Sequence, residues 1–211
     1  MPYFEYVSKE EVSRVKNELT KFINIIQSDI RDKFTFTYSF VGNSTRNMVT
    51  TNYYSNIGYD YDVSIMVNNA DEIEESQIVN ILKTAFDKYS DLFKYNNIDD
   101  DKRVISIRLK DKKRSKLNHI CDFGIHKKGT DESIQYLSYS KKNNKYSWVN
   151  IPRGIASLDH KIMWLKDNGY WQEVRDIYLE KRASGINKNK PTRLIFNDVV
   201  SLIFEASSLN N

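Results

Sequence analysis

Three aspartates in apolar surroundings are the residues of this sequence best suited to chemistry. Asp60 and Asp62 stand two positions apart in the run YDYDVSIMV, and Asp122 stands alone in LNHICDFGI. Residues i and i+2 of a β-strand point to the same face, so Asp60 and Asp62 would present two carboxylates side by side. Like charges that close together repel one another unless a cation lies between them. The pair is therefore predicted to bind Mg²⁺, with Mn²⁺ as the alternative ion.

Asp122 is predicted to complete this metal site. An acid with apolar residues on both sides needs a partner, and a metal ion shared with Asp60 and Asp62 would supply one. Three carboxylates from two strands could hold two metal ions for an in-line displacement at phosphorus. Two plainer interpretations stay open: a D-x-D pair can be a solvated strand edge, and Asp122 can be a hydrogen-bonded structural acid.

A short polar turn upstream of the aspartates offers a place for phosphate. Gly42, Asn43 and Ser44 follow an apolar strand and precede a helix that is predicted to begin near Thr45. Backbone N–H groups and a hydroxyl at a helix N-terminus bind anions such as the terminal phosphates of a nucleotide. Arg46, one turn into that helix, is predicted to contact a phosphate as well. By itself, the same sequence is also typical of an ordinary turn.

The order of these motifs resembles the polymerase-beta-type nucleotidyltransferase superfamily, in particular its small bacterial minimal nucleotidyltransferases. The family pattern is an apolar residue, Gly, and Gly or Ser, then an acid–apolar–acid strand, then a third acid on a later strand. The match covers roughly residues 34–125. The resemblance implies that Asp60, Asp62 and Asp122 are catalytic metal ligands. It also implies that the turn beginning at Gly42 binds the nucleotide.

Two features depart from the family pattern. Asn43 stands where a second small residue is usual, which would narrow the approach of the turn to phosphate. The segment between Ser44 and Asp60 is longer than usual, and residues 50–58 are interpreted as an insertion of unassigned role. Neither departure removes a metal ligand.

Hydrophobic periodicity predicts the elements that must position these residues. Apolar side chains at helical spacing predict helices over residues 8–32 and 72–95, and alternating apolar and polar residues predict strands. The acidic run Asp99–Asp101 is expected to lie in a solvated loop. The predicted strands are residues 34–40, 60–67, 104–110, 117–125, 133–140 and 146–151.

The resemblance and the periodicity together predict an α+β nucleotidyltransferase fold, with a mixed sheet flanked by helices and a C-terminal helical module. Apolar residues after Pro152 recur at helical spacing throughout. The expected division is therefore a catalytic domain over residues 1–152 and a helical module over residues 153–211.

Composition limits the class of protein. The chain has 211 residues, of which 40% are hydrophobic and 28% charged, as expected of a globular protein. Its one cysteine, Cys121, excludes a disulfide framework within the chain and is typical of a reducing compartment. No run approaches the roughly 18 apolar residues of a membrane span. A cytoplasmic protein without a membrane partner is expected.

A basic turn between two of the predicted strands could contact a nucleic acid. The segment RLKDKKRSK carries six basic residues and one acid, in a chain whose net charge is +4. Lys112, Lys113, Arg114 and Lys116 are the candidates for contacts with phosphates of RNA or another nucleic acid. A solvated hairpin tip is the alternative interpretation.

These features predict an Mg²⁺-dependent enzyme that moves a nucleoside monophosphate from an NTP, such as ATP, to an acceptor hydroxyl and releases pyrophosphate. Several acceptors stay open. One is RNA such as tRNA, in a toxin-like or defence role with a cognate antitoxin or partner protein. Others are a protein side chain, an antibiotic, or a second nucleotide that would give an oligonucleotide. The alternative from another class is a catalytically silent nucleotide- or partner-binding module. Neither the NTP nor the oligomeric state can be inferred from the sequence.

Overall fold

The chain forms two compact units in the computed structural model. The larger unit is Tyr6–Thr51 with Asn56–Ile151, and the smaller unit is Met1–Glu5, Asn52–Ser55 and Pro152–Asn211. The fold is α+β, as the sequence predicted. The structure describes residues 3–52, 59–100, 105–111, 116–151, 155–184 and 192–208.

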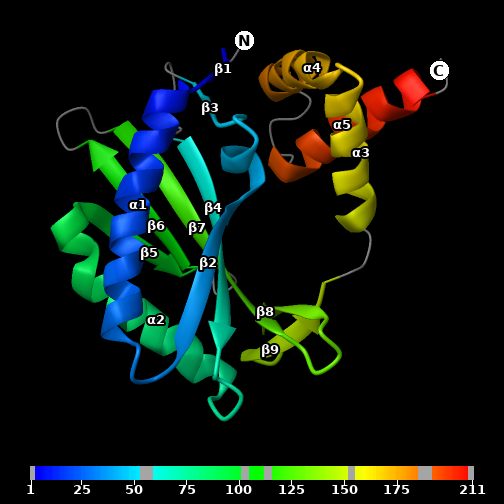
Figure 1. The fold of residues 1–211 in the computed structure, drawn as a ribbon. Helices are drawn as coiled ribbons and strands as arrows, with labels where there is room; N and C mark the ends of the chain where they lie inside the picture. The colour runs from blue at the N-terminus through cyan, green and yellow to red at the C-terminus, as the bar shows by residue number, and fades with distance from the viewer. Residues whose placement is uncertain are drawn as a thin grey trace. The chain divides into compact units, whose positions relative to one another are not determined.

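A mixed β-sheet forms the centre of the larger unit (Figure 1). Its strand order is β2-β4-β7-β6-β5, with β8 paired to β7 and β9 paired to β8. The β4–β7 pair is parallel, and the other pairs are antiparallel. Two short strands, β1 (Glu5–Tyr6) and β3 (Thr50–Thr51), form a separate small sheet. The strands of the large sheet are β2 (Thr35–Val41), β4 (Tyr59–Asn68), β5 (Tyr95–Asp100), β6 (Ile105–Asp111), β7 (Lys116–Lys128), β8 (Ile134–Ser140) and β9 (Lys145–Asn150).

Two helices, α1 (Lys9–Asp29) and α2 (Glu75–Ser90), cover one face of this sheet (Figure 1). Aromatic rings connect the two helices with the sheet. Phe22 of α1 meets Phe86 of α2 edge-to-face, with ring centroids 5.4 Å apart, and Phe86 meets Phe123 of β7 in the same way at 4.7 Å. Edge-to-face pairs are a favoured geometry for buried aromatic rings. The core therefore holds β7, the strand that carries Asp122, firmly against the helices.

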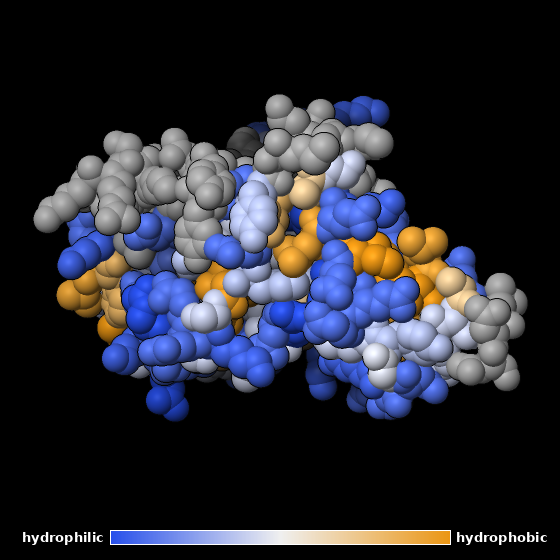
Figure 2. All heavy atoms as spheres, turned by 90° about the horizontal axis from the view of Figure 1, so that it is seen from above, coloured by the Kyte–Doolittle hydropathy of each residue, from blue (hydrophilic) through white to orange (hydrophobic). Residues whose placement is uncertain are grey.

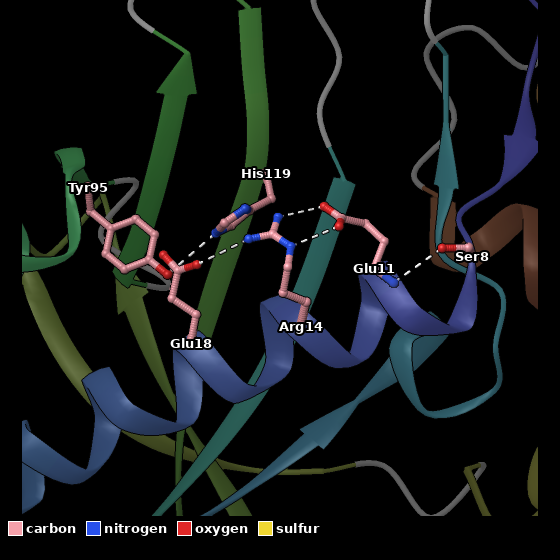
Figure 3. Close-up of polar contacts among 6 residues, drawn as sticks. All are labelled: Ser8, Glu11, Arg14, Glu18, Tyr95 and His119. Atoms are coloured by element: carbon pink, nitrogen blue, oxygen red, sulfur yellow. Dashed lines mark hydrogen bonds and ion pairs between the residues drawn. The ribbon is translucent and has the colours of Figure 1, made fainter.

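Charged side chains of α1 lie next to a buried histidine of β7 (Figure 3). Arg14 donates to both carboxylate oxygens of Glu11, at 2.9 and 2.7 Å, and lies 3.8 Å from Glu18. His119 is 1% exposed, and its Nε2 lies 3.4 Å from the hydroxyl of Tyr95. Burial, helped by the nearby Arg14 charge, lowers the pKa of His119 to about 4. His119 is therefore a neutral core residue on the helix-covered face of the sheet.

The C-terminal segment of the smaller unit contains three described helices, α3 (Ile155–Asp167), α4 (Trp171–Ala183) and α5 (Thr192–Ser208). Tyr178 of α4 is fully buried against Phe196 of α5, with ring centroids 6.2 Å apart. None of the described helices is long and apolar enough to cross a membrane. Apolar side chains reach the surface of this unit (Figure 2). Exposed large apolar residues of these helices include Met163, Leu194 and Leu202.

The helix predicted to begin near Thr45 is absent, and this prediction was wrong. A single 3₁₀ turn, η1 (Gly42–Thr45), ends at Arg46, and Asn47 follows with φ of 54°. The hydroxyls of Ser44 and Thr45 donate to backbone carbonyls three residues earlier, at 3.1 and 2.8 Å. Such local hydrogen bonds compete with helix formation. Arg46 therefore caps a turn and does not lie one turn into a helix.

Strand β5 was also missed from the sequence. Asp99 and Asp100 were expected in a solvated loop, but they pair with Ser106 and Ile105 of β6. Asp101 lies outside the described residues. β5 is the last strand at its edge of the sheet, and its sequence YNNIDD lacks the apolar alternation by which a strand is recognised.

Candidate active site

The three predicted aspartates lie on one face of the sheet, which we call the aspartate face. In β4, Tyr61 is buried against the helices, whereas Asp60 and Asp62 on either side of it are exposed. In β7, Cys121 is fully buried, and the next residue, Asp122, is half-buried on the opposite face. Since strand residues alternate between faces, all three carboxylates emerge on the side of the sheet away from α1 and α2.

The parallel pairing of β4 with β7 brings two of the aspartates directly together. Asp62 is the pairing partner of Asp122, whereas Asp60 pairs with Ile120, one row away on the same face. Neighbouring strands are about 4.8 Å apart, so the Asp62 and Asp122 side chains leave the sheet next to each other. In the part of the chain that the structure describes, no three acidic, histidine or cysteine side chains are grouped closely enough to hold one ion.

The charges and oxygen donors at the Asp62–Asp122 pair fit a hard divalent cation. Burial raises the pKa of the Cys121 thiol, and the negative charges of Asp122 and Asp62 raise it further. Two carboxylates on adjacent strands are the kind of ligand that Mg²⁺ takes, with water or phosphate in the remaining positions. The residues present therefore fit a metal ion at this pair, with Asp60 on the same face one row away.

Ser106 orients Asp122 and was not predicted from the sequence. Ser106 of β6 is the pairing partner of Asp122, and its hydroxyl donates a hydrogen bond to Oδ1 of that carboxylate. The serine is only 7% exposed. A hydrogen bond from a buried hydroxyl to a charged carboxylate fixes the direction of the group. Only the strand register identifies Ser106, because no local motif distinguishes it in the sequence.

Gly42 lets the polar turn approach the aspartates closely. Val41 pairs with Asp62, so η1 begins beside that residue. Gly42 has φ of +67°, and a Cβ at this position would lie 2.6 Å from Oδ2 of Asp62. Both the left-handed backbone and the lack of space therefore require glycine here.

Lys16 of α1 holds the turn from the core side. Its Nζ donates to the Ser44 carbonyl at 2.8 Å and lies 5.2 Å from the centre of the Phe40 ring. Burial lowers the pKa of Lys16. Ser44 itself is buried, and its hydroxyl donates to the carbonyl of Val41 at 3.1 Å. The Ser44 hydroxyl, predicted to contact phosphate, therefore stabilises the turn in this structure.

The other two predicted phosphate contacts lie at the ends of the same turn. Asn43 is half-buried, and its carbonyl accepts hydrogen bonds from the N–H groups of Arg46 and Met48, at 3.2 and 3.0 Å. Arg46 is half-buried as well. Both residues thus belong to the turn that touches Asp62, although the helix expected to present Arg46 is not there.

The predicted nucleic-acid contacts are not placed by the structure. Lys112, Lys113 and Arg114 lie outside the described residues, and the description of Lys116 is confined to its backbone at the start of β7. Of the segment 50–58, residues 50–52 are described and include β3.

A polar pocket of about 320 Å³ lies at the turn between β7 and β8 and contains none of the predicted site residues. It is lined by Asp71, Lys127, Lys128, Gly129, Thr130, Asp131, Gln135 and Asn150.

Comparisons with known proteins give structural matches only. No protein-family model and no curated protein sequence matches the chain. The STING-associated CdnE c-di-GMP synthase from Capnocytophaga granulosa aligns with a TM-score of 0.59 at 16% identity, over 93% of this chain and 60% of that one. Vibrio cholerae DncV cyclic AMP-GMP synthase gives a TM-score of 0.58 at 10% identity, over 82% and 60%.

A third structure of the same kind is the CD-NTase CdnG of Bradyrhizobium diazoefficiens in complex with GTP. It aligns with a TM-score of 0.52 at 9% identity, over 83% of this chain and 44% of that one. This chain therefore spans 60% or less of the length of each of the three structures.

Proposed function

We propose that this chain, which has the polymerase-beta-type nucleotidyltransferase fold that its sequence resembles, transfers a nucleoside monophosphate from an NTP to an acceptor hydroxyl. The observation that carries the proposal is the pairing of Asp62 with Asp122 beside the Gly42 turn. The arrangement supports phosphoryl chemistry because it combines two adjacent carboxylates with a backbone turn that approaches them closely. Pyrophosphate is the leaving group.

Asp62 and Asp122 would hold the Mg²⁺ ion, and Asp60 would extend the row of oxygen ligands toward a second ion. When bound, Mg²⁺ neutralises charge on the reacting phosphate and lowers the pKa of the attacking hydroxyl. Ser106 keeps the Asp122 carboxylate in a fixed direction. Gly42 allows the turn to lie beside Asp62, where its backbone can position the phosphates. The protein contributes mainly positioning to such a reaction.

We propose a second nucleotide as the acceptor. Support comes from the solved structures of this fold, which include enzymes described as c-di-GMP and cyclic AMP-GMP synthases. An RNA acceptor with a toxin-like or defence role, a protein side chain and an antibiotic are separate outcomes of the same assay. The basic turn on which the RNA interpretation depends lies largely outside the described residues.

The test is a transfer assay with α-labelled ATP, GTP, CTP and UTP, singly and in pairs, with Mg²⁺ or Mn²⁺. Parallel reactions contain total cellular RNA, protein extract or an aminoglycoside antibiotic. We expect label in short oligonucleotides, and we expect Asp62→Asn and Asp122→Asn to reduce it to background. Asp87→Asn is the matched control, because it removes one negative charge from an exposed site on α2.

Transfer by Asp62→Asn at the level of Asp87→Asn would contradict the proposed site. Nucleotide binding without transfer to any acceptor would favour the catalytically silent module. Label on RNA, on protein or on an antibiotic would support NMP transfer but would show that the acceptor is not a second nucleotide.

A further inference from the structure

A second pair of polar side chains lies on the aspartate face, one row beyond the carboxylates. Ser64 follows Asp62 by two residues in β4, and His126 follows Asp122 by four residues in β7. The Ser64 hydroxyl lies 2.9 Å from Nδ1 of His126. Neither residue was assigned a role from the sequence.

The hydrogen bonds of His126 determine which ring nitrogen carries the proton. Nδ1 lies 3.1 Å from the carbonyl of Gly124, and a carbonyl can only accept. The proton is therefore on Nδ1, which donates to Gly124 and to the Ser64 oxygen. Nε2 is then an acceptor, and it has no hydrogen-bond partner among the residues that the structure describes. The Ser64 hydroxyl keeps its own proton to donate.

Gly124 lets the imidazole fold back toward the carboxylates. A Cβ at Gly124 would lie 3.0 Å from Cε1 of His126, so the ring lies over this glycine. Gly124 pairs with Ser64 and is two residues after Asp122. Two residues of a strand span about 6.6 Å, so the Ser64–His126 pair lies about that far along the sheet from the Asp62–Asp122 pair. Burial lowers the pKa of His126, which favours the neutral ring at neutral pH.

An aromatic side chain continues this surface. Tyr136 of β8 is the pairing partner of His126, and Val149 of β9 is the partner of Tyr136. Tyr136 is 37% exposed and Val149 is 38% exposed. Along the aspartate face, the Asp62–Asp122 pair is thus followed by the Ser64–His126 pair. The side chains of Tyr136 and Val149 come next.

We propose that Ser64 and His126 bind the base edge of a substrate nucleotide. This proposal rests on the proposed function. A base edge presents a hydrogen-bond donor next to an acceptor, which matches the acceptor Nε2 of His126 and the donor hydroxyl of Ser64. The Tyr136 ring provides a surface on which a base can stack. A phosphate suits this pair less well, because it is mostly deprotonated at neutral pH and so offers little to the Nε2 acceptor.

The test measures binding as well as turnover. The imidazole NMR signals of the three histidines are followed during titration with α,β-methylene analogues of ATP and GTP in the presence of Mg²⁺. His126→Gln assigns the His126 signal. We expect this signal to shift to saturation, while the signal of His119, which is buried on the opposite face, stays constant.

The affinities of variants complete the test. We expect His126→Ala to bind the analogue about three- to tenfold more weakly, as is typical for loss of one hydrogen bond. His126→Gln, which keeps an acceptor, should recover part of that loss. Thr37→Ala is the control, because Thr37 is exposed on the same face in the outer strand β2. Circular dichroism checks that each variant is folded.

The outcomes separate the two proposals. If the analogues bind and NTP transfer proceeds, but the His126 signal does not move and His126→Ala binds within twofold of wild type, the base-binding role is wrong and the proposed function stands. If wild type binds no analogue with Mg²⁺ and shows no transfer, the proposed function fails and this inference fails with it.

Discussion

Replacement of Gly42 by alanine should reduce NTP transfer far more than it reduces the stability of the fold. Gly42 has φ of +67°, a conformation that costs a residue with a side chain about 1–2 kcal/mol. The new Cβ would lie 2.6 Å from Oδ2 of Asp62, whereas ordinary contact begins at 3.4 Å. The carboxylate must therefore retreat by the difference, about 0.8 Å. Since Asp62 can move by side-chain rotation, we expect the protein to fold.

The backbone strain lowers stability, whereas the displacement of the Asp62 carboxylate lowers the rate of transfer. A loss of about 1–2 kcal/mol corresponds to a fall in Tm of about 2–8 °C for a chain of this size. A displacement near 1 Å at a positioned catalytic group lowers the rate about 100-fold. We therefore expect Gly42→Ala to lose a modest part of its stability and nearly all of its NTP transfer.

Gly169→Ala is the matched control for the backbone strain. Gly169 also has positive φ, at +80°, but a Cβ there would meet nothing within 4 Å. Thermal unfolding and transfer of labelled NMP are measured for both variants and wild type. We expect comparable losses of stability and a loss of transfer in Gly42→Ala alone. Transfer by Gly42→Ala within threefold of Gly169→Ala, in an active wild type, would refute the role assigned to the contact with Asp62.

Three further predictions test other contacts. Ser106→Ala should lower kcat about 10- to 100-fold with little change in KM, because Asp122 loses a charge-assisted hydrogen bond. Ser106→Thr keeps the hydroxyl and should retain activity. Equal rates for wild type and both variants would contradict this role of Ser106. Lys16→Met should lower the free energy of unfolding by about 1–2 kcal/mol in urea titrations, because the Ser44 carbonyl loses its donor; unchanged stability would show that this bond is dispensable. The pKa of His119 is lowered to about 4 from 6.5, so its contribution to stability is complete above pH 6.5 and is lost as the pH falls toward 4. Between pH 7 and pH 5 the loss is about 2 kcal/mol, and His119→Gln should remove that part of the pH dependence.

Local sequence patterns predicted much of this fold. Ser8 caps the helix that the sequence predicted over residues 8–32, because the Glu11 N–H donates to the Ser8 hydroxyl at 3.2 Å (Figure 3). The two-residue spacing of Asp60 and Asp62 placed them on one face, because alternation is a property of any strand. The fold itself is confirmed by the likeness to nucleotidyltransferase structures. The metal-binding and catalytic roles of the aspartates remain predictions.

Contacts between distant segments could not be predicted in the same way. The pairing of Asp62 with Asp122 and of Ser106 with Asp122 depends on strand register, which is set by packing across the whole sheet. The helix expected after Ser44 failed because side-chain hydroxyls bind the backbone locally. The fold of His126 back over Gly124 depends on a rotamer that no sequence pattern records.

The parallel pairing of β4 with β7 has a consequence for synthesis of the chain. Parallel neighbours cannot be joined by a tight turn, and here α2, β5 and β6 lie between them in the sequence. Closing so long a loop costs chain entropy before its contacts form, which makes such pairings slow. A growing polypeptide therefore carries the glycine turn and the first two aspartates without the Asp62–Asp122 pair while α2, β5 and β6 are synthesised. That pair is completed only when β7 has left the ribosome and inserted between β4 and β6.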